Sequence, residues 1–179
     1  MALPLLTTDR LLLRQRHETD IPAILRMDLD PEVMRFLDGP RTDTVAHEKE
    51  VRERIHRDFG PGLGYWSVFR RERPDGFLGY VSLHTMPDYT EVELGYRFDR
   101  PAWGQGFAAE AGAACLDHAF RTLALPEIVA VVDPDNRASL RVIAKLGFQA
   151  AGRRHAYRKD LLFYRFERMS YRPGGLAVQ

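Results

Sequence analysis

The sequence predicts a mixed α/β fold, in which one sheet carries antiparallel and parallel strands and has helices on both faces. The stretch 91–132 alternates strand, helix and strand, and such a βαβ unit makes its two strands parallel. Two aromatic-rich segments, 65–69 and 77–83, are separated by the turn-forming sequence 73–76 and predict an antiparallel hairpin. The run 128–132 is continuously apolar, which is typical of a strand buried on both faces.

Capping residues locate the helices of the first half of the chain. A strand is expected over 10–16, around three consecutive leucines. The three stretches that follow each begin at a Thr or Asp, whose side chain can accept from the free N–H groups of a helix start. These helices are expected from Thr19 or Asp20 through Met27, from Asp30 through Leu37, and from Thr42 or Asp43 to about Arg57.

The second half contains the βαβ unit and a basic tail. Asn136 caps a helix that Gly147 stops. We expect strands over 91–98 and 128–132, a loop over 99–106, a helix over about 107–123, and one or two strands over 153–172 before a flexible 173–175. No internal repeat or linker interrupts the chain, so one domain over 1–179 is the simplest organisation.

The composition argues against several classes of protein. Of 179 residues, 45% are hydrophobic, which is enough for a core, and 26 basic against 25 acidic side chains leave a net charge of +1. This balance gives no electrostatic reason to expect a nucleic-acid or membrane partner. The single cysteine excludes an internal disulfide framework and suits a reducing cytoplasm. No signal-peptide pattern opens the chain, and no apolar run reaches about 18 residues.

The hexapeptide 103–108 joins a predicted strand to a predicted helix. Its two glycines let the backbone approach a ligand, and the helix start has no Ser, Thr, Asp or Asn cap, so its first N–H groups lack a partner. Free backbone donors at the positive end of a helix make a pyrophosphate site. A tight turn with glycines for geometry alone is the alternative. The hexapeptide is neither a Walker motif nor the dinucleotide fingerprint, which needs a third glycine.

Five segments, in order along the chain, resemble the GNAT acetyltransferase superfamily, and most closely its ribosomal-protein N-terminal (alanine/serine) acetyltransferases. They cover roughly residues 7–170, and their combination is far more specific than any one of them. The segments are 8–14 (TDRLLLR), 92–96 (VELGY), 103–111 (WGQGFAAEA), 133–139 (DPDNRAS) and 141–148 (RVIAKLGF).

The resemblance implies a GNAT fold, with a mostly antiparallel mixed sheet of about six to seven strands, helices on both faces and a splayed central parallel pair. It also implies acetyl-CoA as the acetyl donor. The family's pyrophosphate loop falls on Trp103, Gly104, Gln105, Gly106, Phe107 and Ala108, with Trp103 in place of the usual basic or amide residue. The residues matching the pantetheine gap are Tyr96, Arg97 and Phe98, and Asn136 matches a position that commonly contacts the cofactor arm.

Acetyl transfer to an amine requires a base for the amine proton, donors for the oxyanion and a proton for the departing thiolate. The resemblance puts Glu93 where the family often keeps its base, and partial burial would raise its pKa and help it accept a proton, either directly or through water. A solvated carboxylate or a reader of substrate charge is the alternative. Glu91, on the same strand face, is a weaker candidate. The oxyanion donor is expected to be a backbone N–H near Tyr96.

Ser139 lies in the first turn of the helix that Asn136 caps. Many relatives have a tyrosine one turn later that protonates the thiolate, but Ile143 occupies that position here and has no proton to give. Ser139 could hydrogen-bond the sulfur instead, or could simply bond its own backbone.

Other chemically active side chains have simpler explanations. Cys115 lies among alanines and is predicted to be a small core residue rather than a nucleophile. The histidines show no metal-ligand spacing, so no metal is expected. Trp66, Tyr80 and Tyr89 could line an acceptor pocket or pack in the core.

The sequence thus predicts an acetyl-CoA-dependent N-acetyltransferase that acts on a primary amine by direct attack in a ternary complex. The resemblance favours a protein N-terminal α-amine as the acceptor. A small-molecule amine is one alternative, and a CoA-binding sensor module without significant catalysis is another. For the oligomeric state, the resemblance allows a homodimer, since family members often dimerise.

Overall fold

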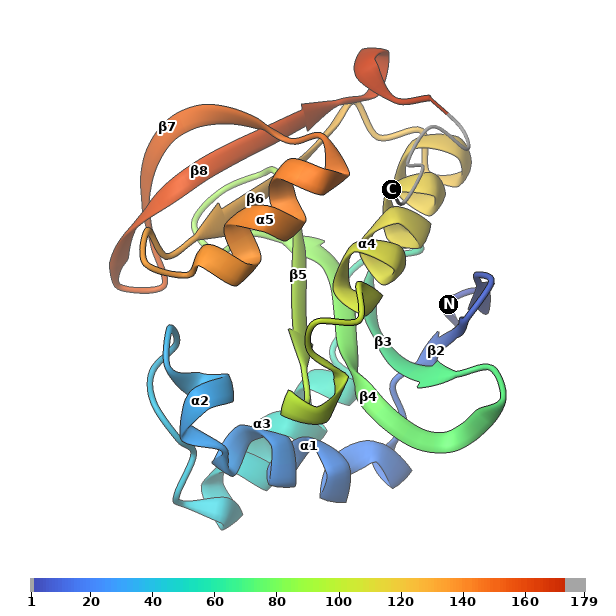
Figure 1. Cartoon of the computed structure of the whole chain (residues 1–179), viewed down its shortest axis with the longest axis vertical. Coiled ribbons are helices and arrows are strands. Elements are labelled where there is room, and N and C mark those ends of the chain that lie inside the picture. The colour runs from blue at the N-terminus through green and yellow to red at the C-terminus, as the bar shows by residue number, and fades with distance from the viewer. Residues whose placement is uncertain (1, 173–179) are drawn as a thin grey trace.

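The structure, a computed structural model, describes residues 2–172 and centres on one sheet of eight strands (Figure 1). All neighbouring strands are antiparallel except β5 and β6, in the order β1-β2-β3-β4-β5-β6-β8-β7. The strands are β1 Leu6–Thr7, β2 Leu11–Gln15, β3 Gly64–Arg70, β4 Arg73–Thr85, β5 Val92–Phe98, β6 Glu127–Val132, β7 Gln149–Ala156 and β8 Lys159–Glu167. The predicted mixed sheet is confirmed, while the predicted ending 173–175 lies outside the described residues.

The sheet has more strands than the expected six to seven, for two reasons. The first strand, β1, has two residues and pairs with β2, and it is too short to produce a periodic pattern. The tail forms a complete hairpin, because β7 begins at Gln149 rather than at the expected Arg153 and pairs with β8.

The hairpin of β3 and β4 is confirmed, but its turn lies earlier than predicted. Arg70 pairs with Arg73, so residues 71–72 make the turn. The next pair is Phe69 with Phe77, which leaves 74–76 as an interruption on β4. Proline cannot donate to a ladder and glycine favours bulges, so the sequence that predicted a turn forms a bulge instead.

The helices begin where capping side chains predicted. Asp30, Asp43 and Asn136 each accept a backbone N–H in the first turn of the helix that follows. Asp20 is different, because its carboxylate binds Arg14, Ser67 and the His17 N–H instead of capping α1. The helices are α1 Ile21–Leu29, α2 Pro31–Met34, α3 Thr44–His56, α4 Phe107–Asp117, which continues as a π-helical turn His118–Thr122, and α5 Arg137–Leu146.

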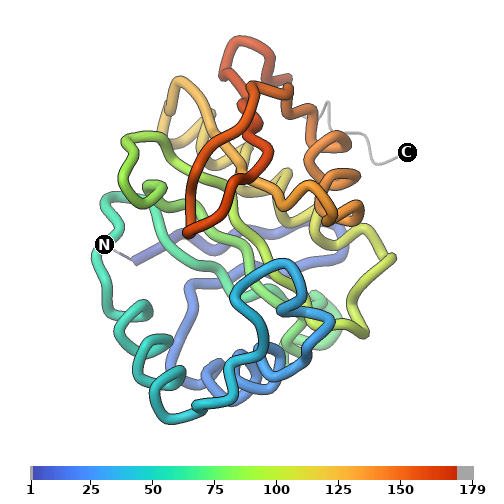
Figure 2. Tube along the Cα trace, turned by 90° about the vertical axis from the view of Figure 1, so that its left-hand side faces the viewer, coloured from blue at the N-terminus to red at the C-terminus, as the bar shows by residue number. Residues whose placement is uncertain are grey.

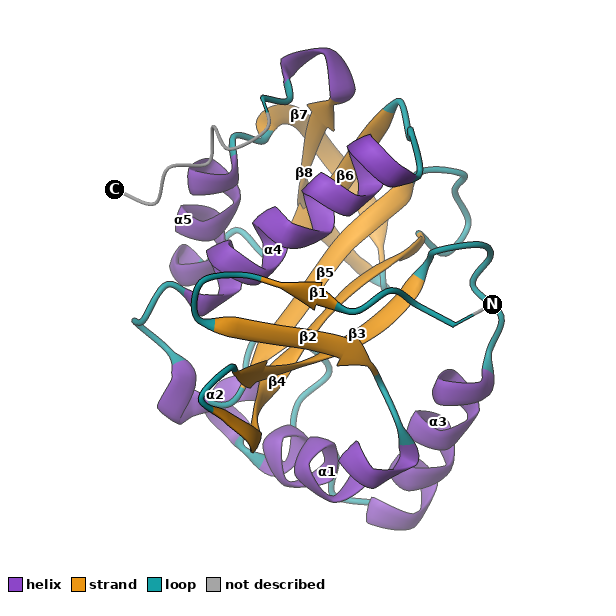
Figure 3. Ribbon diagram, turned by 90° about the vertical axis from the view of Figure 1, so that its right-hand side faces the viewer, coloured by secondary structure: helices purple, strands orange, loops and turns teal. Residues whose placement is uncertain are grey.

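Strand alternation gives the sheet two different faces. One face packs against α4 and α5 and forms the main apolar core, which includes Leu11, Leu13, Trp66, Val81 and Leu94. The opposite face is polar and aromatic over β2 to β5, and α1 and α3 lie on it. Figure 3 shows α1 and α3 grouped together, away from α4 and α5. Among the described residues, no helix is long and apolar enough to span a membrane.

Candidate active site

The parallel strands β5 and β6 pair at only one position, Glu93 opposite Val129. β5 continues to Phe98 and β6 to Val132, so the two strands separate toward their carboxyl ends. The β6-facing edge of β5 after Glu93 therefore lies outside the ladder. An unpaired strand edge offers backbone N–H and C=O groups to an extended ligand. The expected splayed pair is present, and Tyr96, Arg97 and Phe98 lie on its open edge.

The loop after β5 leads into α4 through two glycines in the left-handed region. Gly104 has φ 72° and Gly106 has φ 79°, a conformation that costs other residues free energy. Gly106 is the N-cap of α4 and brings no side-chain cap. A Cβ on Gly104 would meet no protein atom within 4 Å, and one on Gly106 would meet only Arg10 Nη2 at 3.6 Å. The Cβ positions of both glycines therefore adjoin open space, next to a helix start that no N-cap side chain caps.

The side chains of this loop stabilise its shape. Trp103 Nε1 donates to the Phe98 carbonyl at 2.8 Å. Gln105 Nε2 donates to the Pro101 carbonyl at 2.8 Å, and Gln105 Oε1 accepts from Arg70 Nη2 at 2.6 Å. These side-chain groups are engaged within the protein, which leaves the backbone donors of the loop for a ligand. Phe107 is buried in the core, and Ala108 packs against it.

The start of α5 faces β5 across the splay. Asn136 Oδ1 accepts the Ser139 N–H at 3.0 Å, as the predicted cap requires. Ser139 Oγ lies 2.7 Å from the Tyr96 hydroxyl, so a β5 side chain and an α5 side chain form a hydrogen-bonded pair. Burial raises the pKa of Tyr96 to about 12, against the opposing effect of the Ser139 hydrogen bond, and the phenol keeps its proton at neutral pH.

Glu93 is buried, with 5% of its surface exposed. Burial raises its pKa to about 7, although a hydrogen bond from the Tyr157 hydroxyl opposes the rise. The alternative of a solvated strand carboxylate is therefore wrong. His84 pairs with Glu93 across β4 and β5, and burial with nearby arginines lowers the pKa of His84 to about 4, so it is neutral at pH 7. Glu93 is a carboxyl group that can exchange a proton near neutral pH.

Tyr157 is a site residue that sequence reasoning missed. It occupies the two-residue turn between β7 and β8, where Tyr157 has φ 52° and Arg158 has φ 62°. Hairpin turns of this kind usually carry Asn-Gly or Asp-Gly, so Tyr157-Arg158 did not predict a turn. Tyr157 is 42% exposed while its partner Glu93 is buried. The Tyr157 side chain therefore lies between the buried Glu93 carboxyl and solvent.

The same hairpin is fastened to the loop after α2. Lys159 Nζ donates to the Leu37 carbonyl at 2.6 Å and to the Phe36 carbonyl at 3.2 Å. Figure 2 shows the tip of the β7–β8 hairpin reaching toward this loop. The two contacts hold the Tyr157 turn against the helical layer that covers the polar face of the sheet.

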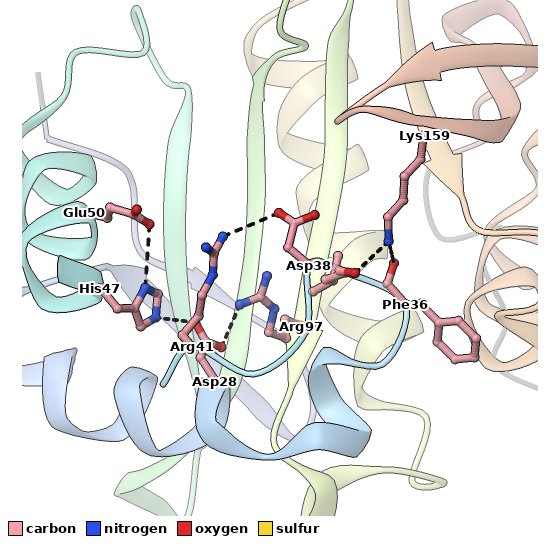
Figure 4. A network of polar contacts seen from close by, with 9 residues as sticks. Asp28, Phe36, Asp38, Arg41, His47, Glu50, Arg97 and Lys159 are labelled. Atoms are coloured by element: carbon pink, nitrogen blue, oxygen red, sulfur yellow. Dashed lines mark hydrogen bonds and ion pairs between the residues drawn. The ribbon is translucent and has the colours of Figure 1, made fainter. Parts of the chain in front are cut away.

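A buried polar network fixes α1 and α3 to β5 (Figure 4). Arg97 Nη1 donates to Asp28 Oδ1 at 2.6 Å, and Asp28 Oδ2 lies 2.9 Å from His47 Nε2. The Arg97 side chain is thus directed to the helical layer on the polar face. Its expected place in the cofactor site can rest only on its backbone, at the edge of β5.

Other sequence candidates lie outside this arrangement. Glu91 pairs with Arg154 at 2.8 Å, and that hydrogen bond lowers its pKa, so Glu91 is a poor base near pH 7. Cys115 is fully buried, and burial raises its pKa, which leaves it a core thiol. Trp66 is buried in the apolar core rather than on the polar face. Tyr89 donates to the His155 carbonyl.

Metal ligands do not gather in residues 2–172, where no group of three His, Cys, Asp or Glu side chains could hold an ion.

Comparison with known proteins identifies the family. The acetyltransferase (GNAT) domain description matches residues 10–149. The uncharacterised protein YkkB of Bacillus subtilis strain 168 is 31% identical over 173 residues, which cover 93% of this chain and 96% of YkkB. An acetyltransferase structure from Agrobacterium tumefaciens strain C58 superposes with a TM-score of 0.77 at 29% identity, over 93% of this chain and 96% of that one.

RimL, a ribosomal L7/L12 α-N-protein acetyltransferase solved in complex with coenzyme A, has the same fold. Its TM-score is 0.75 at 21% identity, over 92% of this chain and 98% of RimL. The family match spans most of the chain and includes the splayed strands, the uncapped glycine loop and α5. The chain therefore belongs to the GNAT acetyltransferase family and is an acetyl-CoA-dependent N-acetyltransferase.

Proposed function

We propose that this enzyme moves the acetyl group of acetyl-CoA directly to a primary amine in a ternary complex, with Glu93 as the general base. The observation that carries the proposal is the Glu93 carboxyl itself, which is 5% exposed, has a pKa of about 7 and lies at the last paired position before β5 and β6 separate. An effective general base has a pKa near the working pH. A primary amine is mostly protonated, as ammonium, at neutral pH. Glu93 accepts the proton that the amine must lose.

The donor site is proposed along the open edge of β5 and the start of α4. Backbone N–H groups of residues 104–108 bind the pyrophosphate, which favours the positive end of a helix. Open space at both glycines and the missing side-chain cap support this assignment. The backbone of 96–98 binds the pantetheine arm as an added strand would be bound. The side-chain oxygen of Asn136 accepts the Ser139 N–H, so its amide NH₂ is the group that remains to bind the pantetheine arm.

The remaining steps use groups around Tyr96. The amine nitrogen forms a bond to the acetyl carbon, and a backbone N–H near Tyr96 stabilises the oxyanion. The C–S bond then breaks, and Ser139 or Tyr96 donates a hydrogen bond or a proton to the departing sulfur. The 2.7 Å contact between their hydroxyls supports a shared role. Tyr96 on β5 would thus supply the phenol that many relatives have on the helix, at the position that Ile143 occupies here.

We propose a peptide α-amine as the acceptor. RimL, with the same fold, is named for transfer to a protein α-amine. A chimera of the spermidine N-acetyltransferase SpeG from Vibrio cholerae and hSSAT also has this fold, with a TM-score of 0.73 at 20% identity, so a small amine is the alternative class. A sensor module would bind acetyl-CoA without releasing CoA at a useful rate.

Two measurements in sequence test the proposal. Thermal unfolding with acetyl-CoA should show a higher melting temperature than with ATP, NAD or buffer, because a ligand that binds only the folded state stabilises it. CoA release is then followed with peptides and small amines. If the protein binds acetyl-CoA but releases no CoA in the presence of any amine, the result would support the sensor module and contradict acetyl transfer.

A further inference from the structure

Arg16 is a buried cation that has no carboxylate partner among residues 2–172. It follows β2 and is 3% exposed. Its guanidinium carbon lies 4.5 Å from the ring centre of Tyr65 and 4.3 Å from that of Tyr80. Arg16 Nε and Nη2 are buried and have no hydrogen-bond partner in the part of the chain that the structure describes. Buried polar groups nearly always have partners, and an unpaired buried charge is costly.

Two other arginines on the strands of this face each have an acid. Arg14 pairs with Asp20 at 2.6 Å, and Arg97 pairs with Asp28 at 2.6 Å. Arg16 is the exception among the three, even though it is the least exposed. Stacking on two tyrosines satisfies the flat faces of the guanidinium but leaves its edge donors free.

The neighbourhood of Arg16 carries further positive charge. Arg54 and Arg97 lie close enough to disfavour its charged form, with burial as the larger cause, so the pKa of Arg16 is lowered. The Arg97 charge is offset by Asp28, which leaves Arg16 and Arg54 without a described acid in contact. A region with this excess of cations attracts an anion.

Strand register places Arg16 on the same face as Glu93. The Arg16 N–H bonds the Tyr65 carbonyl, Tyr65 pairs with Ser82, and Ser82 pairs with Gly95. Gly95 is two residues from Glu93 on β5. Arg16 stacks on the Tyr65 ring, and the centre of that ring lies 5.6 Å from the centre of the His84 ring. His84 pairs with Glu93 across β4 and β5, so Arg16 and Glu93 border the same region of the polar face. A single small acceptor could contact both.

We propose that the acceptor amine carries a carboxylate a few bonds from its nitrogen, and that Arg16 binds this carboxylate while the amine lies at Glu93. The proposal rests on the acetyl transfer proposed above. A carboxylate matches the planar fork of a guanidinium through two parallel hydrogen bonds, which would satisfy the free donors of Arg16. The carboxylate comes either from the α-carboxyl group of a free amino acid or from an acidic side chain near the N-terminus of a peptide.

Matched acceptors test this specificity and separate the two sources. One arm compares free amino acids with their amides, and the other compares peptide amides that carry Asp or Glu at the second position with those that carry Asn or Gln. In at least one arm, the acid should have a kcat/KM about 10-fold or more above its neutral partner, since charged hydrogen bonds are strong. Arg16→Met should remove the preference by raising KM for the acids alone, and Arg16→Lys should restore part of it.

A control variant and a binding measurement keep the test decisive. Arg121→Met removes one positive charge at an exposed position after α4 and should keep the preference. Thermal unfolding with CoA and the N-acetylated acids or amides measures binding without turnover. Stabilisation by acids only, lost in Arg16→Met, would support the inference even if no amine were acetylated. Equal kcat/KM for acids and amides in both arms, or equal losses for both in Arg16→Met, would overturn it and leave acetyl transfer standing.

Discussion

Replacing Tyr157 with Phe removes one hydrogen bond from the Glu93 carboxylate and keeps the ring that covers it. The Tyr157 hydroxyl donates to Glu93, so it favours the charged form and lowers the pKa that burial raises. A hydrogen bond to a charged group contributes about 1.5–3 kcal/mol, and one pKa unit corresponds to about 1.36 kcal/mol. The variant should therefore raise the pKa of Glu93 from about 7 by about one to two pH units.

The pH dependence of kcat/KM measures this change. In the wild type, the rate should fall on the acid side with an apparent pKa near 7. In Tyr157→Phe, the acid limb should move to higher pH, so that the rate at pH 7 falls by on the order of 10-fold and recovers in alkaline buffer. The ammonium group of the acceptor titrates identically with both enzymes, so the difference between the profiles belongs to the enzyme.

Two results would refute this reasoning. An acid limb that does not move would mean that Glu93 is not the titrating base. A loss of rate that is uniform over all pH values would mean that Tyr157 acts on the structure or on acceptor binding instead.

The same geometry predicts the effects of changes at Glu93, at Gly106 and at the pair of Ser139 and Tyr96. Glu93→Gln should stabilise the fold in alkaline solution but not near pH 4. A carboxyl whose pKa is raised from 4.5 to about 7 destabilises the folded state as the pH rises through that window, by about 3 kcal/mol at pH 8. Urea unfolding at pH 4 and pH 8 tests this prediction. Gly106→Val should weaken acetyl-CoA binding at least about 10-fold by calorimetry, whereas Gly39→Val, with the same positive φ and open surroundings, should leave it unchanged; similar affinities would contradict the phosphate loop. Ser139→Ala and Tyr96→Phe should each lower kcat. If the two hydroxyls act as a unit, the fall in kcat of the double variant should be smaller than the product of the two single falls. A fall equal to that product would show that the two hydroxyls act independently.

The sequence was sufficient for the frame of the site. The βαβ pattern and the glycine loop predicted β5, α4 and β6 in order, and side-chain caps predicted the start of α5. These features depend on local signals, namely periodicity, glycine and capping residues. The resemblance to the acetyltransferases added the splay between β5 and β6, which no local pattern encodes.

Long-range contacts could not be predicted in the same way. Tyr157 reaches Glu93 across 64 positions of sequence, and Tyr96 reaches Ser139 across 43. The Tyr157 turn lacks the glycine or asparagine that usually marks two left-handed residues. Arg16 carries no local signal either, because its unpaired state depends on which acids its neighbours use.

Under the proposed function, the two faces of the sheet would serve the two substrates. The α4 side supplies the uncapped helix start and the core that fixes it. The opposite side supplies Glu93, His84 and the stacked Arg16 beneath the helical layer of α1 and α3. The splay connects the two sides at β5, so under the proposed function a donor along its edge and an acceptor on the polar face would meet near Glu93.

The most direct test of the base assignment is kcat for Glu93→Gln at saturating acetyl-CoA, with the affinity for acetyl-CoA measured in parallel. General-base catalysis contributes about 100- to 10,000-fold. We expect kcat to fall by about that range, the acid limb of the pH profile near 7 to disappear, and acetyl-CoA affinity to stay at the wild-type value. A variant that keeps wild-type kcat and the same acid limb would contradict the account.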